Sequence, residues 1–230
     1  MKGYIYEQFN EISSTNDYLK NRRIDRQNRI AVAKKQLGGR GTKGRSFVSV
    51  EGGLYLSALT FYDNFPADRA FEIMQNTAAA VCETLKVLGV KSQIKWPNDI
   101  FAGGRKICGI LIENTFSGKN ITSSVVGLGL NIYNELPQEL KEIATTVLEQ
   151  TGKRYEVKEV ETLLLSYLER GVKDKYESYL GFIGEKVRLL SCEKEFSGVI
   201  LGVDKQGNLL ARVDGKDCVF ASAEVQIVKN

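Results

Sequence analysis

Residues 95–113 read KWPNDIFAGGRKICGILIE, and this stretch carries the clearest indication of the fold. Pro97 disfavours a helix at Trp96, so an extended tryptophan is expected before a turn that contains Asn98 and Asp99. The apolar runs on either side of the Gly-Gly pair predict a hairpin whose second strand lies inside the protein. Taken alone, the turn is better explained as a support for a buried tryptophan than as a metal site.

The second strand of this hairpin combines a lysine with an interior glycine. Lys106 stands at its entrance, and a lysine partly inside a sheet usually has an anionic partner. A lysine that reaches from the strand edge to solvent is the simpler alternative. Gly109 lies deep in the strand, which indicates close approach by a ligand or by another backbone. The GLGLN segment at 127–131 is weaker evidence of the same kind.

A basic, glycine-rich loop lies upstream of the hairpin. Residues 34–45 read KKQLGGRGTKGR, with four glycines, five cations and no acidic residue. Glycines let backbone amides approach a ligand, and arginine suits phosphate or carboxylate oxygens. The composition predicts a mobile phosphate-binding loop, and an exposed basic hairpin turn is the alternative. A Walker A motif is absent.

Outside these motifs, strands and helices follow one another in mixed order. Strands are expected near residues 4–9, 30–33, 54–61, 94–95, 100–102, 107–112 and 123–128. Helices are expected to open at 13–17 and to span 67–89, 137–144 and 157–171. The fold class is therefore α+β, with a mixed or antiparallel sheet and flanking helices. Five short strands between 187 and 228 predict a small β-barrel, so the chain divides into domains 1–182 and 183–230.

Composition excludes several kinds of chemistry. The 230 residues carry 32 Lys and Arg against 28 Asp and Glu, and they include no histidine. Histidine-based nucleophilic catalysis and histidine-ligated metal sites are thereby excluded. The net charge of +4 is too small to indicate nucleic-acid binding, and the longest apolar stretches are too short for a membrane span. The cysteines form no CxxC pair and predict reduced thiols in a cytoplasmic protein: Cys82, Cys108, Cys192 and Cys218.

Together, in this order and spacing, the motifs resemble those of the biotin protein ligase family. The matching segments are STN at 14–16, Gln36, GRGTKGR at 39–45, EGGLYLS at 51–57, KWPND at 95–99, KICGILIE at 106–113 and GLGLNI at 127–132. The resemblance covers essentially the whole chain. It implies a class II synthetase-like catalytic domain of the biotin/lipoate ligase type, followed by a Src-homology-3-like β-barrel.

The resemblance implies an enzyme that makes biotinyl-5′-AMP from biotin and ATP with Mg²⁺. Such an enzyme then passes biotin to one lysine of a biotin carboxyl carrier protein, as in acetyl-CoA carboxylase. Two anions must meet in the first step, and Arg and Lys can neutralise both of them. A carboxylate nucleophile needs no general base, so the lack of histidine is compatible with this chemistry.

The resemblance also implies roles for individual residues. Those expected to act in catalysis are Lys106, Arg40 and Lys95. Those expected to hold biotin are Ser14, Thr15, Asn16, Gln36, Gly39, Arg40, Gly41, Thr42, Lys106, Gly109 and Gly127. Those expected on the ATP and adenylate side are Arg45, Phe47, Lys95, Asn98 and Asn131. Asp99 is expected to help place Mg²⁺.

Two positions depart from the family pattern. Thr42 stands where the family loop usually has a second arginine, and the loss of that cation predicts faster release of the adenylate. Phe47 stands where the family usually has a tryptophan near the adenine, and a phenylalanine ring can still stack with less area. Neither departure touches Lys106 or the KWPND segment, so activity is still expected.

Several alternatives stay open at this point. A lipoate ligase or octanoyltransferase of the same fold is disfavoured, because the RRxxGGG segment and its histidine are missing. A non-catalytic sensor of biotin or biotinyl-AMP is compatible with Thr42 and Phe47. An RNA-binding barrel is disfavoured, because residues 185–230 carry seven cations and seven acidic residues. Since the first strand begins near Tyr4, no N-terminal DNA-binding domain is expected, and the sequence leaves a homodimer open.

Overall fold

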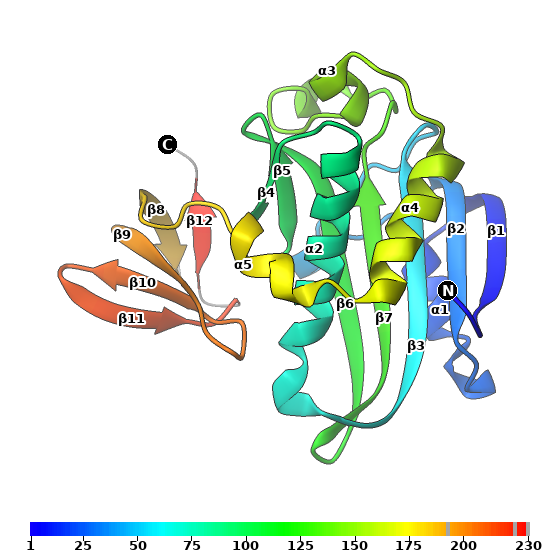
Figure 1. Cartoon of the computed structure of the whole chain (residues 1–230), viewed down its shortest axis with the longest axis horizontal. Helices are drawn as coiled ribbons and strands as arrows, with labels where there is room; N and C mark the ends of the chain where they lie inside the picture. Colours follow the sequence, from blue (N-terminus) through cyan, green and yellow to red (C-terminus); the bar gives the residue numbers. More distant parts are fainter. Residues whose placement is uncertain (192–193, 223–224, 229–230) are drawn as a thin grey trace.

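The computed structural model describes residues 1–191, 194–222 and 225–228 of the chain. Its centre is a seven-stranded sheet in the order β1-β2-β3-β7-β6-β5-β4 (Figure 1). In chain order the strands are β1 (Ile5–Ile12), β2 (Arg29–Gln36), β3 (Leu54–Pro66), β4 (Ser92–Lys95), β5 (Asp99–Ala102), β6 (Arg105–Ser117) and β7 (Asn120–Leu130). Strands β1 and β2 run parallel, and the other neighbouring pairs are antiparallel. The predicted mixed sheet is therefore confirmed.

The two faces of this sheet are covered by different helices, because successive strand residues point to opposite sides. Helices α2 (Phe71–Val87) and α4 (Val157–Arg170) lie over one face (Figure 1) and bury the main core against it. Helix α1 (Thr15–Lys20) packs on the other face. There the buried side chains form a small cluster of Leu19, Ala31, Leu59 and Val125.

The predicted helix starts follow the expected local chemistry. Ser14 caps α1, and its hydroxyl accepts a hydrogen bond from the backbone N–H of Asp17 at 3.3 Å. The helix expected over 67–89 begins as a 3₁₀ turn at Ala67–Arg69, continues as α2 and stops before Gly89, which has a φ of +83°. The helix expected over 157–171 is α4. Shorter helical turns lie at Arg23–Asp25, Thr42–Gly44, Lys173–Lys175 and Tyr176–Tyr179, the last of these being α5.

The helix expected over 137–144 is wrong. This segment has only a 3₁₀ turn at Gln138–Leu140, and the short helix α3 (Val147–Thr151) follows it. Turn-type bonds within the segment do not continue as a helix, and the physical reason is that its C-terminal end bonds with β6. The N–H of Lys106 donates to the carbonyl of Ile143, and the N–H of Thr145 donates to the carbonyl of Lys106, each at 2.9 Å.

The C-terminal part of the chain forms a second sheet in the order β11-β10-β9-β8-β12. Its strands are β8 (Lys186–Ser191), β9 (Lys194–Val203), β10 (Leu209–Val213), β11 (Lys216–Phe220) and β12 (Gln226–Val228). All five predicted strands are present. Among the residues that the structure describes, the predicted small barrel is not closed, because β11 and β12 are the two ends of the sheet and do not pair with each other. Strand β12 is three residues long and pairs with β8 alone.

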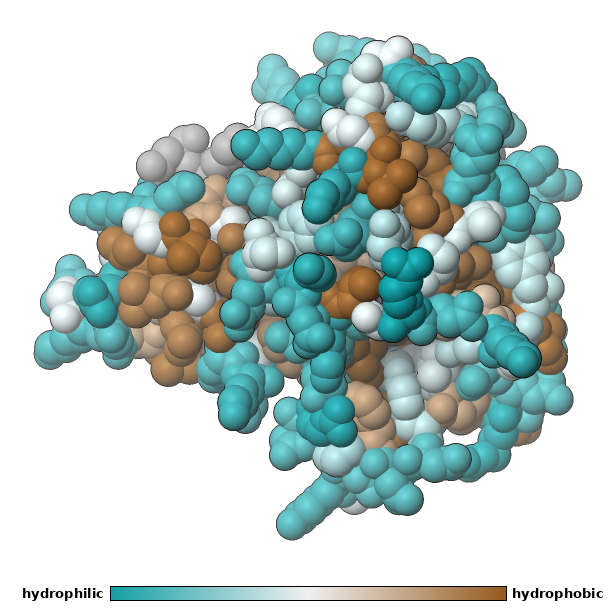
Figure 2. Space-filling model, in the orientation of Figure 1, coloured by the Kyte–Doolittle hydropathy of each residue, from teal (hydrophilic) through white to brown (hydrophobic). Residues whose placement is uncertain are grey.

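The two sheets are joined through a short connection that lies along β4. Leu180 makes a parallel bridge to Ile94, and the N–H of Gly181 donates to the carbonyl of Ile94 at 2.9 Å. Apolar side chains gather over the C-terminal sheet on the face in Figure 2. Val219 of β11 is 59% exposed. None of the helices in the described ranges is long and apolar enough to cross a bilayer.

Candidate functional site

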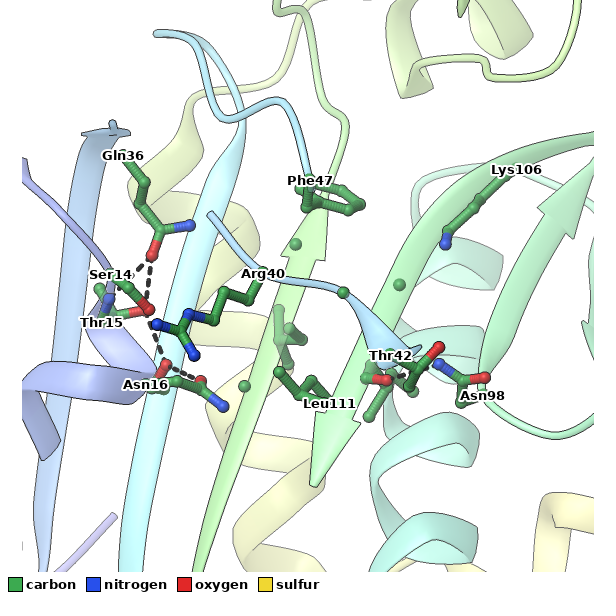
Figure 3. A pocket seen from close by; sticks show the side chains of 17 residues that line it. Ser14, Thr15, Asn16, Gln36, Arg40, Thr42, Phe47, Asn98, Lys106 and Leu111 are labelled. Atoms are coloured by element: carbon green, nitrogen blue, oxygen red, sulfur yellow. Dashed lines mark hydrogen bonds between the residues drawn. The ribbon is translucent and has the colours of Figure 1, made fainter. Parts of the chain in front are cut away.

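A pocket opens on the α1 face of the large sheet, at the meeting point of the predicted motifs (Figure 3). Strands β3, β6 and β7 form its floor, and the basic loop passes over it. The space inside is about 40 Å³, which is enough for only a few water molecules. The expected residues that line the pocket are Ser14, Thr15, Asn16, Gln36, Arg40, Gly41, Thr42, Phe47, Asn98, Lys106, Gly109 and Gly127.

Polar side chains at one end of the pocket form a connected hydrogen-bond network. The side-chain oxygen of Gln36, Oε1, accepts hydrogen bonds from the backbone N–H and the hydroxyl of Thr15, at 2.8 and 3.0 Å. Ser57 lies in the same network, with its Oγ 2.7 Å from Thr15 Oγ1 and 2.5 Å from Asn16 Oδ1. The Gln36 amide group donates to Ser49 at 2.9 Å. These fixed donors and acceptors suit a small polar group such as a cyclic urea.

An acidic residue behind this network orients the amide of Asn16. Glu113 accepts from Asn16 Nδ2 at 3.1 Å, and its other oxygen lies 2.8 Å from the ammonium of Lys20. The bond to Glu113 fixes which side of the amide donates, so Asn16 Oδ1 points toward Ser57. The sequence assigned no role to Glu113 or Ser57. Glu113 lies on the same face of β6 as Gly109, so the period of two along that strand could have identified it.

Three glycines let other side chains approach the floor of the pocket. A Cβ atom on Gly127 would lie only 1.9 Å from Asn16 Oδ1, and one on Gly129 would lie 2.4 Å from the Phe47 ring. A Cβ on Gly109 would be 3.1 Å from the end of the Lys106 side chain. A ligand or another backbone was expected close to Gly109 and Gly127, but the groups that approach these glycines are the side chains of Lys106 and Asn16. Gly129, to which the sequence assigned no role, contributes in the same way.

The two cations of the pocket are each paired with a carboxylate, Lys106 at the end away from the polar network and Arg40 beside α1 (Figure 3). The Lys106 ammonium lies 2.6 Å from Asp99 Oδ1, so the anionic partner expected for this lysine is Asp99. Arg40 Nε lies 3.0 Å from Asp17 Oδ2. Figure 3 shows Lys106 and Asn98 on the opposite side of the pocket from Gln36 and Ser14–Asn16. One cavity therefore joins a neutral polar end to a cationic end.

The basic loop is a compact turn that also covers the pocket. The Gly41 N–H donates to the carbonyl of Arg45 at 2.7 Å, and the Phe47 N–H donates to the carbonyl of Gly39 at 2.8 Å. Gly39 lies outside the pocket lining, but a Cβ there would be 2.4 Å from the Phe47 carbonyl. Phe47 extends over the floor, and the Lys106 ammonium lies 5.7 Å from the centre of its ring.

Some expected residues do not line this pocket. The Lys95 ammonium lies over the Phe101 ring, 4.9 Å from its centre. Asn131 is buried, and its Nδ2 donates to the carbonyl of Thr145 at 3.1 Å. Arg45 is exposed on the loop. Asp99 reaches the pocket through its ion pair with Lys106.

The buried thiols near the site are not suited to nucleophilic chemistry. Cys82 and Cys108 are free, as predicted, and so is Cys218. Cys192 lies outside the described residues. Burial raises the pKa of Cys108 and raises that of Cys82 to about 12. Both thiols are therefore protonated at neutral pH. In the described ranges, no group of three or more Cys, Asp or Glu side chains is arranged to hold a metal ion by itself.

Comparison with known proteins identifies the family. The model of the biotin/lipoate A/B protein ligase family matches residues 9–131, and the biotin protein ligase C-terminal domain matches residues 182–228. The chain therefore belongs to the biotin/lipoate A/B protein ligase family. Its similarity extends over both sheets. The biotin--[acetyl-CoA-carboxylase] ligase of Paracoccus denitrificans is 26% identical to this chain over 212 residues, which are 84% of this chain and 88% of that protein.

Three relatives show the extent of the similarity. The bifunctional ligase/repressor BirA of Escherichia coli is 32% identical over 219 residues, which are 89% of this chain and 68% of that protein. BirA of Bacillus subtilis is 30% identical over 213 residues, 86% of this chain and 66% of the relative. The chain thus spans about two thirds of the length of these relatives. The solved biotin protein ligase from Aquifex aeolicus, in complex with biotin and ATP, has a TM-score of 0.79 and 29% identity, with both chains fully covered.

Proposed function

We propose that the protein is a biotin protein ligase. It would activate biotin with ATP to form biotinyl-5′-AMP and transfer biotin to a lysine of a biotin carboxyl carrier protein. The observation that carries this proposal is the single cavity that joins the Gln36–Thr15–Ser57 network to the Lys106 and Arg40 cations. The similarity to ligases crystallised with biotin and ATP supports the same function.

The neutral end of the cavity suits the ureido ring of biotin. Asn16, Ser57 and Gln36 offer both donors and acceptors in fixed positions, which a cyclic urea requires on its two sides. Gly127 lets the Asn16 side chain lie against the pocket floor, where its amide would face the ring. Of the biotin-binding residues expected from the sequence, Gly39 would act by letting the loop base close rather than by touching biotin.

The cationic end suits the reacting anions. A biotin carboxylate oxygen would attack the α-phosphorus of ATP, the bond from that phosphorus to the bridging oxygen would break, and pyrophosphate would leave. Lys106 and Arg40 would stabilise the negative charge that both anions bring together. Lys106 would exchange the Asp99 carboxylate for substrate oxygens. The residues that we propose to contact the nucleotide are Lys95, Arg45, Phe47, Asn98 and Asn131.

The second step needs no histidine. The neutral amine of the carrier lysine would attack the biotinyl carbonyl carbon, the acyl–phosphate bond would break, and AMP would leave as the amine loses its proton. Asp99 fits Mg²⁺, because magnesium commonly takes one or two protein oxygens together with phosphate and water. Bound there, the ion would neutralise phosphate charge.

We also propose that the chain divides into domains 1–182 and 183–230 and that the protein is cytoplasmic. A homodimer stays a prediction.

The experiment that tests the function is pyrophosphate release from ATP, measured with and without biotin. We expect biotin-dependent release by the wild type and a loss of about a hundredfold or more in Lys106→Ala, since a charge-assisted contact is removed from the transition state. Lys119→Ala, an exposed lysine in the β6–β7 turn, is the matched control. Biotin binding without pyrophosphate release would indicate a sensor, and release with lipoate instead of biotin would indicate a lipoate ligase.

A further inference from the structure

Trp96 is the one tryptophan of the chain. It lies in the turn between β4 and β5 of the large sheet, but its side chain packs into the core of the C-terminal sheet. Its side chain is 2% exposed. The indole Nε1–H donates to the backbone carbonyl of Gly207 at 2.9 Å. The apolar residues of the same cluster are Val187, Leu189, Ile200, Leu209, Ala211, Val225 and Ile227.

The carbonyl that accepts this hydrogen bond belongs to a well-held turn, residues 204–208. The Asp204 carboxylate accepts from the backbone N–H groups of Gln206 and Asn208 and from Asn208 Nδ2, each at 2.9 Å. Gly207 has a φ of +85°, and a Cβ atom there would lie 2.3 Å from the Phe71 ring of α2. The turn therefore presents its carbonyl at a fixed place against the large domain.

The backbone that follows Trp96 leads directly into the pocket. Asn98 lines the pocket, and its Nδ2 donates to the carbonyl of Ile110 at 2.7 Å. The Ile110 N–H donates back to the carbonyl of Asn98 at 3.0 Å. Asp99, the next residue, pairs with Lys106. A shift of Trp96 would therefore move Asn98 and Asp99, which follow it by two and three residues and flank the place of the reacting anions.

We propose that Trp96 is a positioning residue through which the 204–208 turn of the C-terminal domain sets the place of Asn98 and Asp99. This inference rests on the proposed ligase function and assigns the C-terminal domain a part in adenylate formation. The polar network that would hold the ureido ring lies on β2, β3 and α1, away from this link. The link therefore acts on the reaction step and not on biotin binding.

The test uses two variants of the full chain, Trp96→Phe and Asp204→Ala. Trp96→Phe keeps an aromatic ring but removes the indole donor, and Asp204→Ala releases the turn without changing a residue of the large domain. We expect each to lower the turnover rate for biotin-dependent pyrophosphate release about five- to tenfold, as expected from the loss of one or two hydrogen bonds, while the Kd for biotin changes less than about twofold. Asp217→Ala, which removes an exposed carboxylate of β11 paired with Arg212, is the control and should leave both quantities unchanged.

Tryptophan fluorescence gives an independent reading, because Trp96 is the sole tryptophan. Asp204→Ala should move its emission to longer wavelength, whereas Asp217→Ala should not. A shifted emission with a normal turnover rate would overturn the proposal. So would a parallel loss of biotin affinity and turnover, because that result indicates general loss of structure. An inactive wild type would refute the ligase function itself, which is a different result from active enzyme that is insensitive to both variants.

Discussion

Gly127→Ala tests most directly how the pocket holds the polar end of its ligand. The added Cβ would lie 1.9 Å from Asn16 Oδ1, whereas real Cβ contacts are essentially never shorter than 3.0 Å. The Asn16 side chain must therefore move by about 1 Å, which is enough to break a hydrogen bond of ordinary length. Its two present partners are Ser57 and Glu113. The backbone of β7 has little freedom to yield, because both neighbouring strands hold it.

The magnitude follows from the bonds that Asn16 would lose. A neutral hydrogen bond contributes about 1 kcal/mol, and a bond to a charged group about 1.5–3 kcal/mol. If the ligand loses the bond to the displaced amide and the amide is left poorly paired, biotin binding weakens by about 2–3 kcal/mol, or about 30- to 150-fold. The free energy of unfolding of the free protein should fall by a similar amount.

Titration calorimetry with biotin, together with thermal unfolding, measures both effects. Gly198→Ala in β9 is the matched control, since it also adds a methyl group to a strand glycine, but its Cβ would come no nearer than 3.0 Å to any atom, with Leu189, Val213 and the Arg212 carbonyl at 3.0, 3.1 and 3.3 Å. Combining Gly127→Ala with Asn16→Ala should cost little more than either change alone, because both act through one side chain. Wild-type affinity for biotin in Gly127→Ala would refute the assignment of Asn16 to the ligand.

Three further predictions concern other parts of the protein. Thr42→Arg restores a cation to the loop and should slow dissociation of preformed biotinyl-AMP about tenfold or more. A chase with unlabelled adenylate measures this rate, and equal dissociation rates for the wild type and the variant would contradict the prediction. Glu113→Ala leaves the Asn16 amide unoriented and should weaken biotin binding about tenfold, with turnover at saturating biotin nearly normal in a pyrophosphate assay. Glu72 has a pKa lowered to about 2 by its bonds to Arg69 and Lys173, so it stabilises the fold above its usual pKa of 4.5 and loses this as the pH falls toward 2. Unfolding of Glu72→Gln should therefore differ from wild type at pH 7 and converge with it near pH 2, and a constant difference would contradict the assignment.

The parts of the site that the sequence predicted are those where chemistry restricts the residue. A loop that approaches anions needs glycines and cations, so residues 39–45 stand out in any context. Lys106 and Gly109 stand out for a similar reason, because each is unusual inside a strand. The pairing of Lys106 with Asp99 also follows from a general rule, that a half-buried ammonium has an acidic partner.

The parts that the sequence did not predict depend on which segments meet after folding. Residues 137–144 have no local signal against a helix, and the segment is diverted from one where Ala144 bridges to Lys106 of β6. Trp96 is an apolar residue of the kind found in any core, and the sequence around it does not indicate which of the two cores its side chain enters. Glu113 looks like a polar residue at a strand end until α1 brings Asn16 beside it. Such contacts are decided by tertiary structure.

Strand β7 carries two classes of residue, one that does not tolerate a smaller side chain and one that does not tolerate a larger one. Leu128 and Leu130 fill the core beneath α2, where the removal of even a few atoms leaves a cavity. Gly127 and Gly129 face the pocket, where the addition of a single carbon meets another side chain. A saturation scan of this strand should therefore alternate with a period of two, with losses caused by smaller residues at one position and by larger residues at the next. Such a pattern would reveal the ligand-facing side of the sheet without any ligand being known.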